Sequence, residues 1–332
     1  MKIITFEEHA SDKAIAAASA RYIGETFPNI KHMNAPGMTA VPKLGALDDL
    51  GERRLADMDA NGITMQIISY SNQPQLLPGK EAIPLTQDAN DRLAAAIKAY
   101  PDRFGAFATL PWSAPEAAAD ELERAITGLG LNGALITGRP SAEAIFLDDK
   151  RYWPVLETAA RLNVPIYIHP GFPGLNIQKD YYSGFSPLVE TAFSLYGWGW
   201  HAEAGIQVIR MILSGIFDKY PNLQLIAGHW GEMVPFFLER LDMSMPKSLT
   251  KLEKNISEYF RAHVYVTPSG MFSYPQLKYV MDTIGIERIL YSVDYPYIED
   301  NGKAVAFLKN APISQDEKEM IAYKTAERLL KQ

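Results

Sequence analysis

Short apolar runs alternate with amphipathic stretches along almost the whole chain. Eight runs are rich in β-branched and other apolar residues, which is typical of buried strands. Strands that alternate with helical patterns indicate repeated βα units and a parallel sheet. The expected strands are Lys2–Phe6, Thr64–Ser69, Phe104–Thr109, Gly133–Ile136, Pro165–Ile168, Gln224–Ala227, His263–Val266 and Arg288–Val293.

Helical patterns fill the intervals between these runs. Apolar residues recur four apart in the stretch Leu85–Ala99, and Pro115 can open a helix over Ala114–Thr127. A last helix is expected over Ser314–Leu330, where Ser314 is a candidate N-cap with Glu317 three residues later. We interpret these segments as the outer layer of an α/β fold.

The count of eight units predicts a (β/α)8 TIM-type barrel that occupies residues 1–332 as a single domain. A chain of 332 residues with 47% hydrophobic content can bury a large core, and no low-complexity linker divides it. The longest connection, from Pro170 to Trp200, contains eight aromatic residues. Such a segment is expected to form a lid or pocket wall, or to cover a subunit interface.

Composition narrows the class of protein. The net charge of −7 and the pI near 5.5 argue against binding of nucleic acid or of an anionic membrane. No apolar segment approaches the roughly 20 residues of a membrane helix, so we expect a soluble, cytoplasmic protein. Because cysteine is absent, any metal must be bound by histidine and carboxylate ligands.

Potential metal ligands stand at the carboxyl ends of the expected strands. Catalytic residues of such barrels gather at this face. Glu7 and His9 are two residues apart and should project to the same side of a strand, whereas Glu8 points the other way. Further candidates are His169 after the fifth run, His229 after the sixth and Asp294 after the eighth.

A cation bound by two imidazoles and two carboxylates suits Zn, Mn or Fe(II). Glu232 follows His229 by three residues, so its carboxylate can reach back to the imidazole if a helix begins there. We assign this pair to proton handling or substrate orientation. His263 begins its strand and Arg103 precedes another, which favours structural roles for both. His201 fits either a pocket or a helix start.

These residues lie in motifs that resemble the amidohydrolase superfamily, in particular its metal-dependent hydroxybenzoate decarboxylases of the γ-resorcylate and 2,3-dihydroxybenzoate type. The resemblance implies that Glu7, His9, His169 and Asp294 are metal ligands and that His229 and Glu232 are active-site residues. The motifs are Phe6-Glu7-Glu8-His9, Pro101-Asp102-Arg103-Phe104-Gly105-Ala106-Phe107-Ala108-Thr109, Ile168-His169-Pro170, Gly215-Ile216-Phe217-Asp218, Gly228-His229-Trp230-Gly231-Glu232 and Ser292-Val293-Asp294-Tyr295-Pro296.

Two departures from the superfamily pattern bear on the cofactor and the substrate. Hydrolytic members typically open with His-x-His and many carry a lysine at the fourth strand, but this chain has Glu7 and ends that run at Thr137-Gly138. One divalent ion, Zn or Mn, is therefore expected rather than two. The decarboxylases lead us to expect Asn where Thr137 stands, so the particular hydroxybenzoate stays open.

The resulting hypothesis is a decarboxylase of a small aromatic carboxylic acid. The cation would chelate the carboxylate and the phenolic oxygen, and Asp294 would protonate the ring carbon before CO2 leaves. His229 and Glu232 would hold the substrate or relay protons. The alternatives are a mononuclear metal-dependent hydrolase of a lactone or amide and, as a minor possibility, a purely structural metal. The resemblance also implies a homodimer or homotetramer.

Overall fold

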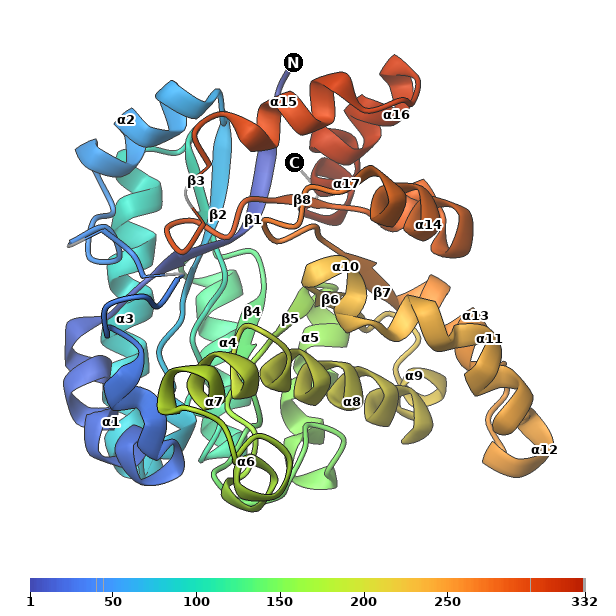
Figure 1. Cartoon of the computed structure of the whole chain (residues 1–332), viewed down its shortest axis with the longest axis horizontal. Coiled ribbons are helices and arrows are strands. Elements are labelled where there is room, and N and C mark those ends of the chain that lie inside the picture. Colours follow the sequence, from blue (N-terminus) through green and yellow to red (C-terminus); the bar gives the residue numbers. More distant parts are fainter. Residues whose placement is uncertain (40, 44, 299, 331–332) are drawn as a thin grey trace.

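The computed structural model describes residues 1–39, 41–43, 45–298 and 300–330, and Figure 1 shows its helices arranged around a central set of strands. All strands pair in parallel. Their bounds are β1 Ile4–Ala10, β2 Met65–Tyr70, β3 Phe104–Ala106, β4 Ala134–Thr137, β5 Pro165–His169, β6 Gln224–Ala227, β7 Val264–Val266 and β8 Tyr291–Ser292.

Helices occupy most of the remaining described chain. They are α1 Lys13–Thr26, α2 Glu52–Asn61, α3 Gly79–Ala99, α4 Pro115–Thr127, α5 Trp153–Leu162, α6 Leu175–Tyr181, α7 Pro187–Ser194, α8 Gly199–Leu213, α9 Ile216–Lys219, α10 His229–Glu232, α11 Val234–Ser244, α12 Lys247–Thr250, α13 Ile256–His263, α14 Tyr274–Ile284, α15 Lys303–Asn310, α16 Gln315–Glu319 and α17 Thr325–Leu330. Short 3-10 or π segments are η1 Pro28–His32, η2 Pro74–Leu76, η3 Lys150–Tyr152, η4 Ile286–Arg288 and η5 Met320–Lys324.

The eight strands form a barrel, as the alternating pattern predicted. They make two four-stranded sheets, in the orders β3-β2-β1-β8 and β4-β5-β6-β7. Single parallel bridges, Ala108 to Ala134 and Val266 to Ile289, join the sheets at both seams. The carboxyl ends of the strands, which carry the candidate ligands, therefore lie at the same end of the barrel. We call this end the mouth.

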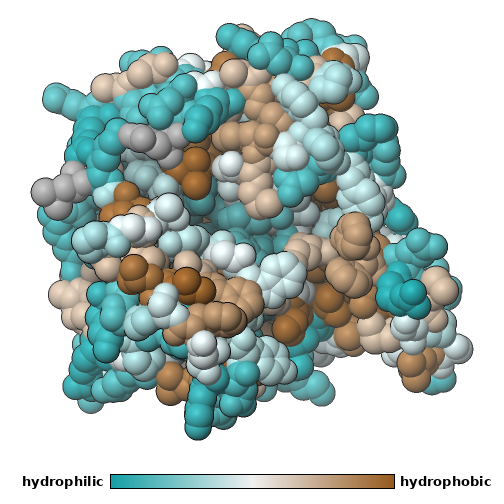
Figure 2. Space-filling view, viewed as in Figure 1, coloured by the Kyte–Doolittle hydropathy of each residue, from teal (hydrophilic) through white to brown (hydrophobic). Residues whose placement is uncertain are grey.

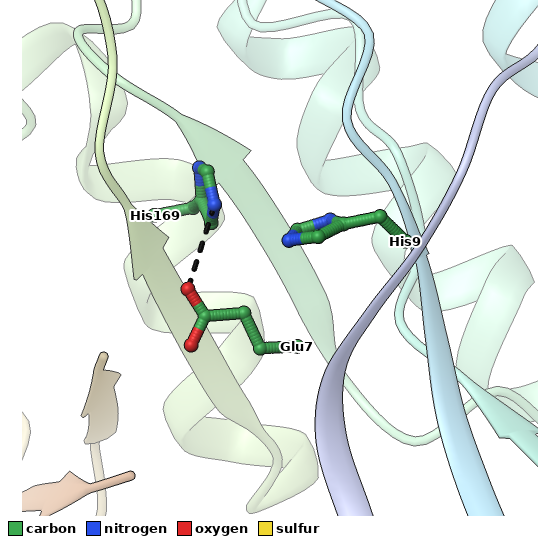
Figure 3. A group of neighbouring side chains, drawn as sticks. All are labelled: Glu7, His9 and His169. Atoms are coloured by element: carbon green, nitrogen blue, oxygen red, sulfur yellow. Dashed lines mark ion pairs between the residues drawn. The ribbon is translucent and has the colours of Figure 1, made fainter. Parts of the chain in front are cut away.

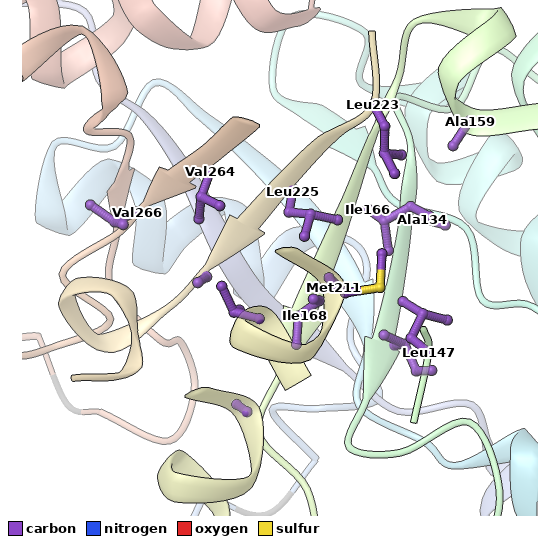
Figure 4. Close-up of a cluster of buried hydrophobic side chains, with 14 of the residues drawn as sticks. Ala134, Leu147, Ala159, Ile166, Ile168, Met211, Leu223, Leu225, Val264 and Val266 are labelled. Carbon is purple, nitrogen blue, oxygen red and sulfur yellow. The ribbon is translucent and has the colours of Figure 1, made fainter. Parts of the chain in front are cut away.

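Side-chain alternation along the strands divides the core into an inner and an outer layer. In β5, Ile166 and Ile168 belong to the large cluster between strands and helices, which Figure 4 shows around β4 to β7. Tyr167 between them belongs to the inner cluster. The inner cluster also contains Ile4, Phe6, Met65, Ile67, Phe107, Leu135, Ile226, Tyr265, Leu290, Ala326 and Leu329.

The C-terminal helix closes the barrel at the end opposite the mouth. Ala326 and Leu329 of α17 pack into the inner cluster, and Lys2, just before β1, forms an ion pair with Glu327 at 2.8 Å. Figure 1 accordingly shows the two chain ends near each other. The expected N-cap of this region is confirmed, because Ser314 and Glu317 form a capping box, although the helix contains the π segment η5.

Among the described helices, none has the length and hydrophobicity required to cross a bilayer.

We predict that the inner cluster carries much of the stability. Ile67 in β2 is fully buried, so Ile67→Ala should lower the free energy of unfolding by about 2–5 kcal/mol. Leu249→Ala is the control, because Leu249 is 64% exposed and its truncation should change stability by less than about 0.5 kcal/mol. Urea denaturation followed by circular dichroism measures both; equal midpoints for the two variants would contradict the assignment.

Candidate metal centre and active site

The backbone at the barrel mouth is strained where the candidate site residues lie. Glu7 has a φ of 58° beside a break in the β1–β2 register between Thr5 and Glu8. Left-handed φ values also occur at His229 (49°), Ser269 (44°) and Asp294 (71°). Non-glycine residues adopt this conformation at a cost, and such residues cluster at functional sites. The strain therefore supports a functional role for the mouth.

Glu7, His9 and His169 converge on one small volume. Their ligand atoms all lie within 4.8 Å of one another, and Nε2 of His169 is 3.5 Å from Oε1 of Glu7. Figure 3 shows both imidazoles and the carboxylate pointing toward the space between β1 and β5. Glu8 takes a different direction, accepting hydrogen bonds from the Val293 amide (2.9 Å) and from Gln66 Nε2 (3.3 Å).

The carboxylate of Glu7 uses its two oxygens differently. Oε2 accepts hydrogen bonds from the hydroxyls of Tyr167, Thr267 and Ser269. Oε1 is buried and has no hydrogen-bond donor within the described part of the chain. A buried carboxylate oxygen without a donor is costly unless a cation compensates it, so this atom fits a metal ligand.

The charge state of Glu7 agrees with this interpretation. Burial alone would raise the pKa of Glu7, but His229, His169 and His9 together lower it below its ordinary value. The carboxylate is therefore an anion surrounded by imidazoles.

His9 and His169 have the protonation state that metal ligation requires. Burial lowers the pKa of His9 to about 4 and that of His169 to about 3, so both imidazoles are neutral at pH 7. Nδ1 of His169 donates to the Pro170 carbonyl oxygen at 2.8 Å, which leaves Nε2 free to face Glu7. Neither ring nitrogen of His9 has a hydrogen-bond partner among the described residues.

Asp294 reaches the same volume from the end of β8. Its Oδ1 lies 3.2 Å from Nε2 of His9, yet that nitrogen makes no hydrogen bond among the residues described. Two atoms that are close but not hydrogen-bonded fit two ligands of one cation. Burial, followed by the negative charge of Glu7, raises the pKa of Asp294 well above its ordinary value.

A second group lies beside this centre and contains His229, Glu232 and His201. Nδ1 of His229 is 2.8 Å from Oε1 of Glu232, and Nδ1 of His201 is 2.9 Å from Oε2. The predicted His229–Glu232 contact exists, but the helical reason for it was wrong. The α10 segment contains left-handed residues, including Trp230 at φ 58°, and this tight turn brings the carboxylate back to the ring.

The second group forms an ion pair. Burial alone would lower the pKa of His229, but Glu232 and Glu7 raise it to about 10. Burial alone would raise the pKa of Glu232, but His229 and His201 lower it to about 2. A protonated His229 is a poor metal ligand. This pair is suited to binding an anion and moving protons.

Both groups open into one cavity of about 660 Å³. His169, His201, His229 and Asp294 line it together with Ser71, Asn72, Gln73, Thr137 and Tyr297. The aromatic segment from Pro170 to Trp200 contributes Phe172, Tyr196 and Trp200 to the wall, as the pocket-wall interpretation predicted. Tyr181, Phe185 and Trp198 of the same segment are exposed instead.

The sequence interpretation missed the residues that orient Glu7. Tyr167 was available as a signal, because it lies two residues before His169 and thus on the same face of β5. Thr267 and Ser269 follow β7, a strand whose end carries no histidine or carboxylate in the sequence to mark it. His201, which the sequence left undecided, both begins α8 and lines the cavity. Arg103 has the expected structural role, pairing with Asp59 at 2.7 Å.

The chain is similar to known proteins over nearly its full length. A family model described as amidohydrolase matches residues 40–332. The Emericella nidulans protein named Decarboxylase orsB is 34% identical, covering 99% of this chain and 97% of that protein. The gamma-resorcylate decarboxylase of a Polaromonas species is 33% identical, covering 99% and 98%.

A solved structure extends this similarity to the fold. The crystal structure of 5-carboxyvanillate decarboxylase from Novosphingobium aromaticivorans contains manganese and 4-hydroxy-3-methoxy-5-nitrobenzoic acid. It matches this chain with a TM-score of 0.90 at 31% identity, over 100% of this chain and 96% of that chain.

We predict that the hydroxyls around Glu7 support metal binding. Ser269→Ala removes a donor to Oε2 and should weaken Mn²⁺ binding about 10- to 100-fold, the usual effect of losing a group that orients a ligand. Ser273→Ala is the control, because the Ser273 side chain makes no capping bond at α14. Calorimetric titration of the metal-free protein measures both affinities, and an unchanged Ser269→Ala affinity would refute the supporting role.

Proposed function

We propose, from the premise that the chain belongs to the amidohydrolase family, that it is a metal-dependent non-oxidative decarboxylase of a hydroxy-substituted aromatic carboxylic acid. The observation that carries the proposal is the convergence of Glu7, His9, His169 and Asp294 around buried atoms without hydrogen-bond partners among the described residues. Relatives that match almost the whole chain are decarboxylases by name, which favours loss of CO2 over hydrolysis.

One divalent cation, manganese or zinc, is assigned to Glu7, His9, His169 and Asp294. Two neutral imidazoles and two carboxylates suit either ion, and the Novosphingobium enzyme contains manganese. When bound, the cation supplies Lewis acidity toward the carboxylate and ortho-phenolic oxygens of the substrate. A site with one cation agrees with the absence of a lysine at the end of β4.

Asp294 is assigned the proton transfer. The carboxyl group lines the cavity and accepts the proton of the substrate phenol as the substrate binds. Asp294 then donates this proton to the ring carbon that bears the carboxylate, and a C–H bond forms. The C–C bond to the carboxylate then breaks and CO2 leaves. The electron pair of this bond returns to the ring, and solvent protonates the phenolate product.

His229 and Glu232 are assigned to substrate binding. The imidazolium of His229 offers a positive charge to the anionic substrate, and Glu232 stabilises that charge because its Oε1 accepts a hydrogen bond from Nδ1 of His229 at 2.8 Å. His201 donates from Nδ1 to the other oxygen of Glu232 at 2.9 Å. The carboxylate is thus fixed from both sides, which keeps the His229 ring oriented toward the cavity.

The test of the proposed function compares two reactions. Manganese-loaded protein is incubated with a panel of dihydroxybenzoates and with simple lactones and amides, and CO2 release and ring opening or amide cleavage are measured. CO2 release from a hydroxybenzoate supports the decarboxylase. Hydrolysis of a lactone or amide without CO2 release refutes it in favour of the hydrolase. Chelation that unfolds the protein, with no activity before it, indicates a structural metal instead.

We predict that the two assigned roles separate in the variants. Asp294→Asn cannot donate the proton and should lower kcat by about 10²- to 10⁴-fold, the usual contribution of general acid–base catalysis. His229→Gln should raise KM, because it removes the charge that binds the substrate. Asp149→Asn, a half-exposed surface variant beside Arg151, is the control and should behave as wild type. Full decarboxylation by Asp294→Asn would exclude Asp294 as the donor.

We also propose that the barrel is one domain over residues 1–332 and that copies associate as a homodimer or homotetramer. Phe236, Phe237 and Met243 of α11 are 71%, 52% and 66% exposed, and Figure 2 shows apolar surface over this part of the molecule. Exposed apolar surface of this kind marks contact sites between proteins.

The oligomer is tested by light scattering. The wild type is expected at two or four times the 37.0 kDa chain mass, and Phe236→Asp combined with Phe237→Asp should reduce it to the monomer, because a buried unpaired charge opposes association. Val189→Asp on α7, where Val189 is 50% exposed, is the control and should keep the wild-type mass. A monomeric wild type would overturn the proposal.

A further inference from the structure

The cavity extends well beyond the metal centre. Its volume of about 660 Å³ falls in the range of roughly 300–1,000 Å³ that takes drug-sized ligands, which are larger than one benzoate ring. His169, His229 and Asp294 occupy one part of its lining. A single-ring acid held at the metal centre leaves the remainder of the cavity to another part of the substrate.

Beside polar residues such as Ser71 and Asn72, the remainder has one continuous apolar wall that is built mainly by one segment. Ala16, Ala20 and Ile23 lie three or four residues apart and so share one face of α1, and Ile30 and Met33 continue this surface through and just beyond η1. Phe172, after β5, completes it.

This apolar wall is anchored to the segment that carries His169. Phe172 stacks on the fully buried Phe27 with ring centroids 4.7 Å apart and an interplanar angle of 10°. Gln178 of α6 donates from Nε2 to the Thr26 carbonyl oxygen at 3.0 Å. The wall and the metal centre therefore keep a defined spacing, as a site for two parts of one ligand requires.

Charge around the cavity decides what kind of substituent fits. Across the described stretches of the chain, no lysine or arginine lines it. His229 lies at the metal end, and its Nδ1 already contacts Glu232 at 2.8 Å. A second carboxylate on the substrate would thus lose water at the apolar end without gaining a counter-charge, which is strongly unfavourable. An apolar substituent gains free energy there instead.

We propose that the substrate is an ortho-hydroxybenzoate with an apolar alkyl substituent, which occupies the surface formed by Ala16, Ala20, Ile23, Ile30, Met33 and Phe172. This inference rests on the proposed function for the position of the ring. It adds that aromatic acids with a second carboxylate in this substituent are poor substrates, because that surface offers them no cation.

The first experiment varies the substituent. Hydroxybenzoates with no chain, or with methyl, propyl or pentyl chains at each free ring position, are compared by kcat/KM. Transfer free energies of methylene groups predict a gain of about fourfold per buried CH2 at the matching position. Chains of equal length that end in a carboxylate should lose this gain.

A second experiment does not depend on turnover. Resorcinols with the same chains resemble the products, and their dissociation constants are measured by calorimetry. Affinity should rise with chain length, with an increasingly negative heat-capacity change as apolar surface is buried.

Matched variants locate the substituent. Ala20→Lys places an ammonium group in the apolar surface. It should lower the pentyl preference, which is the ratio of kcat/KM for the pentyl acid to that for the unsubstituted acid, at least about tenfold. It should raise kcat/KM for substrates whose alkyl chain ends in a carboxylate. Ala17→Lys makes the same change three residues earlier on α1, at a position that is exposed, as Ala20 is, but that does not line the cavity. This variant should leave the preference at its wild-type value.

The outcomes separate the two proposals. CO2 release from the unsubstituted acid with no gain from any chain overturns the apolar site but keeps the decarboxylase. No CO2 from any acid overturns the decarboxylase, and the alkylresorcinol affinities then decide the apolar site alone. Equal effects of Ala20→Lys and Ala17→Lys on the pentyl preference would place the alkyl chain of the substrate elsewhere. They would overturn its assignment to the surface that contains Ala20.

Discussion

The buried carboxylate of Glu7 is the constraint on which the barrel mouth depends. A fully buried anion is stable only if hydrogen bonds and charges replace the water it has lost. Tyr167 from β5 and the hydroxyls of Thr267 and Ser269 after β7 supply three hydrogen bonds to one oxygen. These bonds tie β1 to strands across the barrel. They also leave the second oxygen, Oε1, facing His169 without a hydrogen-bond donor among the described residues. The requirement for a cation therefore follows from the way the carboxylate is held.

The same carboxylate helps to divide the histidines into two kinds. His9 and His169 are desolvated more strongly than Glu7 can compensate, and their pKa values fall to about 4 and about 3. His229 faces both Glu232 and Glu7, and its pKa rises to about 10. Neutral rings thus surround the cation position, while a charged ring faces the cavity beside it. One group of residues can bind a metal while the other binds an organic anion, without competition for either ligand.

The fold was largely predictable from local patterns, although strand boundaries were not. The run Gln224–Ala227 was predicted at its observed bounds, whereas the last run shrinks to Tyr291–Ser292 and the first extends to Ala10. The apolar pattern along the chain indicates which residues are buried. A strand also requires regular backbone pairing, and this pairing is lost where the two sheets of the barrel meet. The His229–Glu232 contact shows the same limit, since the spacing was informative while the backbone conformation was not.

The sequence by itself determined the eight βα units, the absence of thiolate ligands and the positions of Glu7, His9, His169 and Asp294 in or just after strands. These properties are local, because alternation and strand polarity depend on neighbours along the chain. Only the tertiary structure decided which oxygen of Glu7 lacks a donor, which histidine is charged, and how far the apolar cavity extends from the metal centre. Those properties depend on desolvation and on distances between residues from different strands, such as Glu7 and Ser269, which no local pattern encodes.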